Sequence, residues 1–490
     1  MSVSVFEKLE PALIWKHFQA LTSIRRPSGE EEQAQEYVRN WAREHDFALQ
    51  EDATGNLVVR VPASPGKEKA PVVIIQGHLD MVCERNSDSP YDSFAGKLHL
   101  LREDDWIKAD GTTLGADNGI GVCAGMAAAE DPAVQQGPLE LLYTIDEETG
   151  MTGARGLSTE MLSGKLMLNL DSEDDDLIFV GCSGGKDTQY RMPITREKVP
   201  AGQVVRKLSI GGLSGGHSGL DINRNRLNAI KALAQILNES GKSADFELLH
   251  IEGGKMRNAI PREAHALLAL DPKQEEALRK AVEAVATQLR AQYEKLEPGF
   301  GVQLESADGK LMQQGAFPRE LKERLLAFLM AIPSGVVAMS QDIEGLVETS
   351  TNLGVLKTGP DALEVVSCSR SSLGPALKAV LGQLAAIARL AGVEIEEVGG
   401  YPGWKPNMDS RALKTVKESY ERLFGEAPQV TAIHAGLECG LIGEHLPGID
   451  MVSFGPSIRG AHSPDERVSI ASVQKFYRLL SEVLKELAKS

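Results

Sequence analysis

The stretch VVIIQGHLD, residues 72–80, decides the fold: an unbroken apolar run leads into two side chains that can bind metal. An apolar run without alternation is typical of a strand buried on both faces of a sheet. Similar runs stand at 139–145, 166–170 and 451–454, and helical segments such as the Gly- and Ala-rich stretch 119–130 lie between them. This alternation predicts an α/β domain with a mostly parallel sheet flanked by helices.

The pattern of predicted strands and helices changes after residue 186. Strand patterns such as VVRKLSI (204–210) now accompany long amphipathic helices, for example over 275–296. The Gly/Pro stretch GGYPGW (399–404) marks the return to the first pattern. The sequence therefore predicts an inserted α+β lid domain over 187–399, within a catalytic domain formed by 1–186 and 400–490.

Composition narrows the class of protein. The 490 residues carry a formal net charge of -17, which disfavours nucleic acid and anionic membranes as partners. Every apolar run is shorter than the roughly 18 residues of a membrane helix, and no signal-peptide pattern opens the chain. Five cysteines without a CxxC motif argue against a disulfide framework. Together these features predict a cytoplasmic protein.

A helix start is expected at Ser28. Ser28 and Glu31 have the spacing of a capping box, in which each side chain satisfies a backbone N–H of the other residue. The apolar residues that follow have helical spacing.

Metal-capable side chains follow the predicted strands directly, and one group precedes the small-residue helix. Because open α/β sheets bind ligands at the carboxyl ends of their strands, these groups are expected to converge. Two imidazoles and three carboxylates suit Zn²⁺, with Mn²⁺ or Co²⁺ as substitutes, and five ligands suit two metals that share one carboxylate. The sequence alone does not choose between the two adjacent glutamates. The candidates are His78, Asp80, Asp117, Glu147, Glu148, Asp171 and His462.

Short motifs and longer strings carry a resemblance to a known family. HLD, GADNG, DEE, LD and AHS resemble the metallopeptidases that include aminoacylase, carboxypeptidase G and peptidase V. DGTTLGADNGIG (110–121), GGHSG, RNAIPRE, HAGLECGL and HSPDE resemble the Xaa-His dipeptidases within that family, from end to end. The resemblance implies that His78 and Asp171 hold one metal, Glu148 and His462 the other, and that Asp117 bridges them.

The same resemblance assigns the groups around the metals. It makes Glu147 the general base and Asp80 the acceptor of the other ring N–H of His78. It also implies a cis peptide after Asp117.

In the lid, the resemblance assigns substrate contacts. His217, in GGLSGGHSG, would stabilise the oxyanion, Asn258 would contact the substrate backbone and Arg370 would bind its carboxylate. Gly436, with Glu438, would shape the pocket. The role of His434 stays open. The other histidines lie in helix or strand patterns without carboxylate neighbours at suitable places and are expected to be structural; they include His17, His45, His99, His250 and His265.

The implied activity is hydrolysis of dipeptides, with a preference for Xaa-His substrates including β-Ala-His. Two Zn²⁺ per chain would hold a bridging hydroxide, and Glu147 would act as base. The alternative on the same scaffold is an N-acyl amino acid deacylase or a carboxypeptidase. A catalytically silent binding protein is disfavoured because all five ligands and Glu147 are present. The lid is about twice as long as in dimeric relatives, which implies that His217 acts within its own chain. Whether the chain forms a homodimer stays an open alternative.

Overall fold

The computed structural model describes residues 5–92 and 95–489, which form two compact units. Unit 1 comprises Met1–Cys182, Trp404–Ala432 and Leu437–Ser490. Unit 2 comprises Ser183–Gly403 together with the short segment Ile433–Gly436. Unit 2 thus begins at Ser183 where the sequence predicted residue 187, and it also contains residues 400–403 and 433–436 of the predicted catalytic domain.

Unit 1 is built on a mixed eight-stranded sheet. Its strands, in spatial order, are β1 (Ala48–Glu51), β2 (Leu57–Val61), β6 (Leu139–Thr144), β3 (Val73–His78), β7 (Leu166–Asn169), β21 (Asp450–Ser453), β8 (Leu177–Cys182) and β20 (Gln429–Ile433). The four central strands β6, β3, β7 and β21 are parallel. The expected parallel arrangement is therefore confined to the centre of the sheet, because β1–β2, β2–β6 and β21–β8 pair antiparallel.

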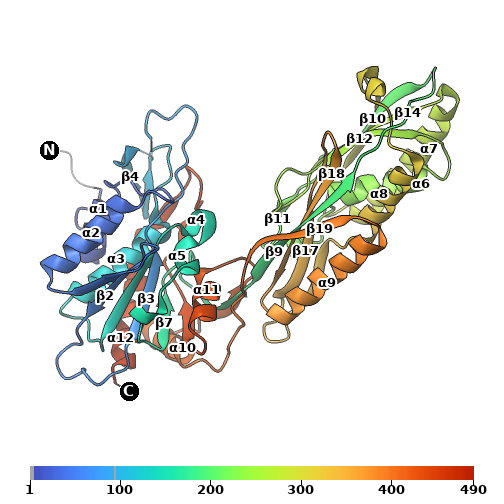
Figure 1. Cartoon of the computed structure of the whole chain (residues 1–490). Coiled ribbons are helices and arrows are strands. Elements are labelled where there is room, and N and C mark those ends of the chain that lie inside the picture. The colour runs from blue at the N-terminus through green and yellow to red at the C-terminus, as the bar shows by residue number, and fades with distance from the viewer. Residues whose placement is uncertain (1–4, 93–94, 490) are drawn as a thin grey trace. The chain divides into compact units, whose positions relative to one another are not determined.

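Helices cover the central strands of unit 1 (Figure 1). The Gly- and Ala-rich helix α3 (Ala116–Glu130) contacts β3 and α1 (Ala12–Leu21), and α10 (Arg411–Phe424) contacts β21 and α12 (Ile470–Leu487). Small residues let α3 approach the sheet closely: a Cβ on Gly121 would lie 2.6 Å from the carbonyl oxygen of Leu170. This close packing fixes the first turn of α3 beside the ends of the parallel strands.

The predicted capping box at Ser28 is wrong. Helix α2 (Glu32–Glu44) begins at Glu32, with Glu31 as its N-cap and no capping hydrogen bond from that side chain. Ser28 and Glu31 instead bond to residues at the ends of β3 and β6, as described below.

His462 lies in a loop of a four-stranded sheet. This sheet has the order β22 (Ile458–Arg459), β23 (Arg467–Ser469), β5 (Trp106–Ala109) and β4 (Leu100–Glu103). His462 lies in the connection between β22 and β23 and adopts a φ of 62°, a conformation that non-glycine residues rarely hold. Strain of this kind is typical of positions that the surrounding structure holds for function.

Unit 2 is a nine-stranded sheet with helices on one face. Eight strands follow the order β15 (Gly301–Ser306), β10 (Val204–Gly211), β14 (Ala264–Leu270), β12 (Glu247–Gly253), β17 (Val347–Thr358), β18 (Ala362–Ser371), β9 (Gly184–Pro193) and β19 (Glu394–Tyr401), and β16 (Gly335–Met339) also pairs with β17. One core joins this sheet to the four helices drawn beside it in Figure 1: α6 (Ala229–Ser240), α7 (Glu275–Tyr293), α8 (Arg319–Ala331) and α9 (Gly374–Leu390). The predicted α/β domain with an inserted α+β lid is confirmed.

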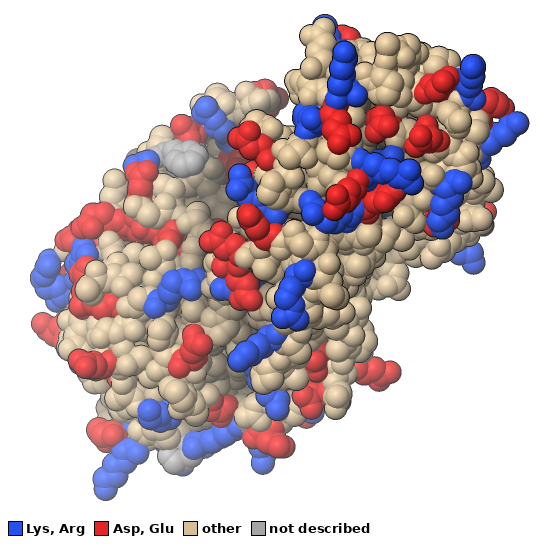
Figure 2. All heavy atoms as spheres, turned by 45° about the vertical axis from the view of Figure 1, so that its right-hand side comes forward, with Lys and Arg blue, Asp and Glu red and all other residues tan. Residues whose placement is uncertain are grey.

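The charges on the surface and the length and polarity of the helices agree with what the amino-acid composition indicated. Figure 2 shows Lys and Arg interspersed with Asp and Glu on the face it presents. Among the described residues, every helix is too short or too polar to cross a membrane.

Candidate metal centre

The carboxyl ends of three parallel strands carry three of the five predicted metal ligands. His78 is the last residue of β3, and Asp171 stands two residues after β7. Glu147 and Glu148 open the short helix α4 (Glu147–Gly150), which follows β6. Parallel strands end at the same edge of a sheet, so the fold brings these side chains together.

Asp117 occupies the first turn of α3 and faces two histidines. One of its oxygens, Oδ1, lies 3.2 Å from His78 Nε2, and the other, Oδ2, lies 3.3 Å from His462 Nε2. The Asp117–Asn118 peptide is cis, as the family resemblance implied. Asp117 therefore stands between two groups of potential ligands.

Each group has the dimensions of a metal site. Around His78 Nε2, Asp171 Oδ1 lies at 3.3 Å, and around His462 Nε2, Glu148 Oε2 lies at 2.9 Å. Tetrahedral zinc with ligands at 2.0–2.2 Å needs ligand atoms about 3.3 Å from one another. The two groups, His78–Asp117–Asp171 and Asp117–Glu148–His462, thus fit two cations that share Asp117.

The charges of the centre favour cations. Burial disfavours a charged His78, but Asp171 and hydrogen bonds to Asp117, Asp171 and Asp80 outweigh it and raise the pKa of His78. Hydrogen bonds to Asp117 and Glu148 raise the pKa of His462 to about 11. The carboxylates therefore hold protons on both imidazoles at neutral pH, where a metal would bind in their place.

Glu147 lies beside this centre. Its carboxylate lies within 4.8 Å of potential ligand atoms of His78 and Glu148. Burial, and then the nearby charges of Asp171, Glu148 and Glu438, raise the pKa of Glu147, although His78 opposes the shift. A carboxyl group with a raised pKa next to a metal site has the properties of a proton-transferring group.

Asp80 connects His78 to the loop that carries the glutamates. Its Oδ1 lies 3.3 Å from His78 Nδ1, and its carboxylate accepts hydrogen bonds from the backbone N–H groups of Glu147 and Glu148 at 3.0 and 3.1 Å. Ser28 donates a third bond at 2.7 Å. Although burial opposes it, the interaction with His78 lowers the pKa of Asp80 to about 2. Asp80 is thus an anion that orients the His78 ring.

Three buried side chains that the sequence did not assign to the centre hold its loops. Glu466 accepts backbone N–H bonds from Leu114, Gly115, Ala116 and Asp117 at 2.7–3.2 Å. Arg26 donates to the carbonyl oxygens of Leu79, Asp80 and Gly115. Glu31 accepts from the N–H groups of Gly29 and Asp146. Glu466 closes the HSPDE motif, and Glu31 was expected to cap a helix, whereas the sequence held no signal for Arg26.

Glu438 is a further buried carboxyl group of unit 1. Gln76 and Thr144 each donate a hydrogen bond of 2.6 Å to Glu438 Oε2. Burial raises the pKa of Glu438 to about 7. Gly436, which the sequence analysis linked with it, lies in the Ile433–Gly436 segment of unit 2.

The predicted lid residues all belong to unit 2. His217, in β11 (Gly216–His217), pairs with Ala259 in β13 (Ala259–Ile260), next to Asn258. The Nδ1 atom of His217 accepts bonds from the N–H groups of Gly219 and Leu220, which places the ring proton on Nε2. Burial and the charge of Arg370 lower the pKa of His217. His217 is therefore a neutral imidazole with an Nε2–H donor.

Together with burial, the positive charge of Arg370 lowers the pKa of two histidines of unit 2, His217 and His434. Arg370 is 6% exposed and donates a 2.6 Å bond to the Tyr401 hydroxyl, while its Nε is buried without a hydrogen bond. Burial and then Arg370 lower the pKa of His434 to about 3, and Ser350 Oγ lies 2.7 Å from its Nε2. A buried guanidinium with an unused donor is suited to bind a carboxylate.

One expectation about the other histidines is wrong. His17 lies 2.8 Å from Glu130, His99 3.6 Å from Asp110 and His250 3.1 Å from Glu252, and His45 and His265 also have a carboxylate within 3.6 Å. The sequence pattern missed these neighbours because most of them come from other elements.

The comparisons with known proteins cover nearly the whole chain. The model of "Peptidase family M20/M25/M40" matches residues 74–486. The cytosol non-specific dipeptidase of Escherichia coli (strain K12) is 39% identical over 485 residues, 99% of each chain. The crystal structure of an aminoacylhistidine dipeptidase from Vibrio alginolyticus is 40% identical, with a TM-score of 0.91 over 99% of this chain and 98% of that one.

A more distant structure shares the fold alone. A tripeptidase from Staphylococcus aureus is 17% identical and has a TM-score of 0.58 over 98% of this chain and 100% of that one. The family match spans most of the chain, and the E. coli relative covers all but a few residues, with the predicted ligands inside the matched range. The chain therefore belongs to the peptidase family M20/M25/M40.

Proposed function

We propose that this chain is a metal-dependent dipeptidase that hydrolyses the single peptide bond of dipeptides and prefers Xaa-His substrates, including β-Ala-His. The observation that carries the proposal is the pair of ligand groups that share Asp117, each with the spacing of a tetrahedral site. Two relatives near 40% identity over nearly the whole chain are called dipeptidases, which supports the substrate class.

The proposed cofactor is a pair of Zn²⁺ ions. His78 and Asp171 would hold one ion, Glu148 and His462 the other, and Asp117 both. When bound, two such cations polarise a carbonyl group and lower the pKa of water. Two imidazoles with three carboxylates give the mixed nitrogen and oxygen set that zinc accepts, and Mn²⁺ or Co²⁺ are the expected substitutes.

Glu147 is the proposed general base. It would take a proton from the attacking water and pass it to the leaving amine, a role that typically contributes about 10²–10⁴-fold to the rate. Its raised pKa supports the second half of this task, because burial and the neighbouring carboxylates make the Glu147 carboxyl group easier to protonate, and a protonated carboxyl group can donate to the leaving amine.

Unit 2 is proposed to recognise the substrate. The Nε2–H of neutral His217 would donate to the oxygen that becomes negative in the transition state. Arg370 would bind the free C-terminal carboxylate, Asn258 the backbone groups, and Gly436 would line the pocket. Because Arg370 would bind the carboxylate that stands one residue beyond the scissile bond, the site would favour dipeptides over longer chains.

A matched pair of substrates tests the activity. β-Ala-His and N-acetylhistidine release the same histidine, but only the first is a dipeptide with a free amine. We expect kcat/KM to be at least about 100-fold higher for β-Ala-His, because a site built to pair a polar group rejects analogues that lack it. A higher value for N-acetylhistidine would replace the dipeptidase with a deacylase.

The role of Arg370 is tested by removing its guanidinium group from the protein and, separately, the carboxylate from the substrate. Arg370→Ala should raise KM for β-Ala-His by about 10-fold or more and change little for β-Ala-His amide, which lacks the carboxylate. Arg389→Ala, an exposed arginine of α9, is the matched control. Equal losses for both substrates would show that Arg370 does not bind the carboxylate.

A further inference from the structure

We propose that unit 2 carries a third metal site, in which His250, Glu252 and His265 bind one Zn²⁺ ion or a similar divalent transition metal. The three residues lie on the face of the sheet opposite the helices and belong to β12 and β14. This site is separate from the catalytic centre and does not depend on the proposed dipeptidase activity.

Strand register brings the three ligands to one place. β12 and β14 are antiparallel, and Glu252 pairs directly with His265. His250 stands two residues before Glu252 and therefore points to the same face of the strand. A register shift between Leu248 and His250 accompanies this arrangement and pairs His250 with Leu267.

The distances fit a cation. His250 Nε2 lies 3.1 Å from Glu252 Oε2, and His265 Nε2 lies 3.6 Å from Glu252 Oε1. The two oxygens of one carboxylate thus face two imidazoles, and all the ligand atoms lie within 4.8 Å of one another. These separations bracket the roughly 3.3 Å between ligands of tetrahedral zinc.

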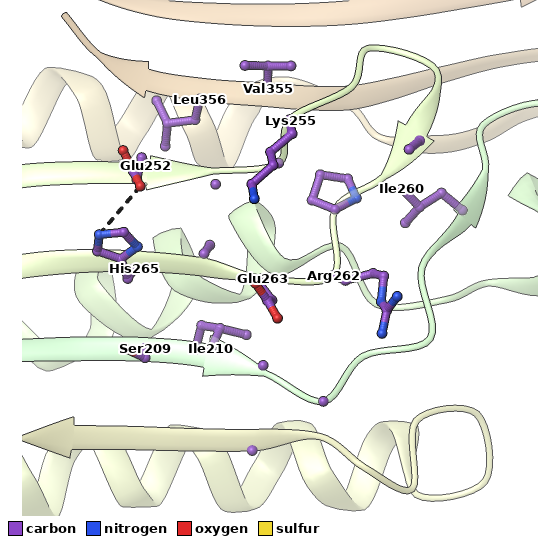
Figure 3. A pocket seen from close by; sticks show the side chains of 18 of the residues that line it. Ser209, Ile210, Glu252, Lys255, Ile260, Arg262, Glu263, His265, Val355 and Leu356 are labelled. Atoms are coloured by element: carbon purple, nitrogen blue, oxygen red, sulfur yellow. Dashed lines mark ion pairs between the residues drawn. The ribbon is translucent and has the colours of Figure 1, made fainter. Parts of the chain in front are cut away.

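Three ligands of this kind leave one coordination position open. Two histidines and one glutamate are the protein ligands of several zinc sites whose fourth position takes water or another small ligand. Glu252 and His265 line a hollow of about 1060 Å³. Figure 3 shows the two side chains facing each other there, with Lys255 and Glu263 on the neighbouring wall.

A nearby charge limits the affinity of the site for a cation. The ammonium group of Lys207 interacts electrostatically with His265. The same Lys207 ammonium repels a cation. We therefore expect this site to bind zinc more weakly than the catalytic centre does.

The group differs from an ordinary histidine–carboxylate pair. Among residues 5–92 and 95–489, four groups of three or more such side chains have metal-site spacing, and three of them lie in the catalytic centre. His250, Glu252 and His265 form the fourth. By contrast, His99 has only Asp110, at 3.6 Å, and forms no such group. A metal on the fourth group would join two neighbouring strands of unit 2 and stabilise that unit.

The test uses the full-length chain with its catalytic centre disabled by His78→Ala and His462→Ala. Zn²⁺ titration by calorimetry should then show one saturable ion per chain. Adding His250→Ala and His265→Ala should abolish that binding, and Glu252→Gln should weaken it about 10-fold or more. Lys207→Gln should tighten binding, whereas His99→Ala should leave it unchanged. Circular dichroism establishes that each variant is folded.

Two outcomes would overturn the third site. One is the absence of saturable binding in the chain that lacks only the catalytic histidines. The other is binding that survives the loss of both His250 and His265. Replacing His250 and His265 in the otherwise native chain should leave kcat/KM for β-Ala-His unchanged. A wild-type chain with no dipeptidase activity would contradict the proposed function and leave the zinc titration as the test of this site.

Discussion

Glu147 is the residue whose replacement separates chemistry from metal binding. Glu147→Gln keeps the size of the side chain but removes the proton acceptor, so we predict a loss of kcat of about 10²–10⁴-fold with both metals retained. Metal content by mass spectrometry and kcat for β-Ala-His measure the two effects. Glu160→Gln, an exposed glutamate of the same unit, should change neither. Wild-type turnover in Glu147→Gln would assign the base elsewhere.

The two histidines of the centre predict proton release when metal binds. The raised pKa values of His78 and His462 favour their protonated forms in the metal-free chain, so metal binding at pH 7.5 should release protons. Metal affinity should accordingly fall as the pH falls. Calorimetric titration in buffers of different ionisation enthalpy counts the protons. Release of none would contradict both shifts.

Residue identities could be predicted from sequence only where a motif marked them. His78, Asp117 and His462 stand in short motifs next to predicted strands or helices, and the structure brings them together. Arg26 had no such signal, because it acts through carbonyl oxygens more than 50 residues away in the sequence. Contacts of that kind depend on the packing of the whole unit.

At the scale of elements, the first turn of α3 depends on one glutamate. Glu466 accepts four successive N–H groups at this turn and is 2% exposed. We predict that Glu466→Ala lowers metal affinity by about 10–100-fold, because an outer partner that orients a ligand is lost. Competition with a chelating dye measures the affinity. Asp465→Asn, its exposed neighbour, is the control, and equal affinity in the two variants would refute this role.

Local patterns mispredicted one element boundary for a physical reason. Ser28 and Glu31 have the spacing of a capping box, yet Ser28 binds Asp80 and Glu31 binds the N–H of Asp146. Side chains that could cap a helix serve equally well as partners for another loop, and the tertiary structure decides between the two. The buried strands were easier to predict because they are apolar without interruption.

At the scale of the whole molecule, the tryptophans report on one unit only. All four, Trp15, Trp41, Trp106 and Trp404, belong to unit 1. We predict that chelation lowers the midpoint of the tryptophan-detected unfolding transition by roughly 10 °C, since metals that bind the native state stabilise it. Circular dichroism follows both units. An unchanged tryptophan transition after complete metal removal would contradict a metal centre in unit 1.

The predicted domain limits came from changes in composition, and such changes are gradual. The Gly/Pro stretch at 399–404 was informative because Tyr401 ends the last strand of unit 2 and Trp404 belongs to unit 1. Ile433–Gly436 could not be found in the same way. Four residues carry no compositional signature, and only their contacts assign them to unit 2.

Because Ile433–Gly436 belong to unit 2, the lid domain is not formed by one continuous segment of the chain. Ser183 N donates to the carbonyl oxygens of Ile433 and Ala435, both at 3.0 Å, and the His434 ring bonds to Ser350. A fragment cut at Ser183 and Gly403 would lack these partners, and a truncated peptidase that kept 433–436 would expose them. Dissection of this enzyme, or transplantation of its lid onto a relative, therefore has to carry a second, distant piece of chain along with the first.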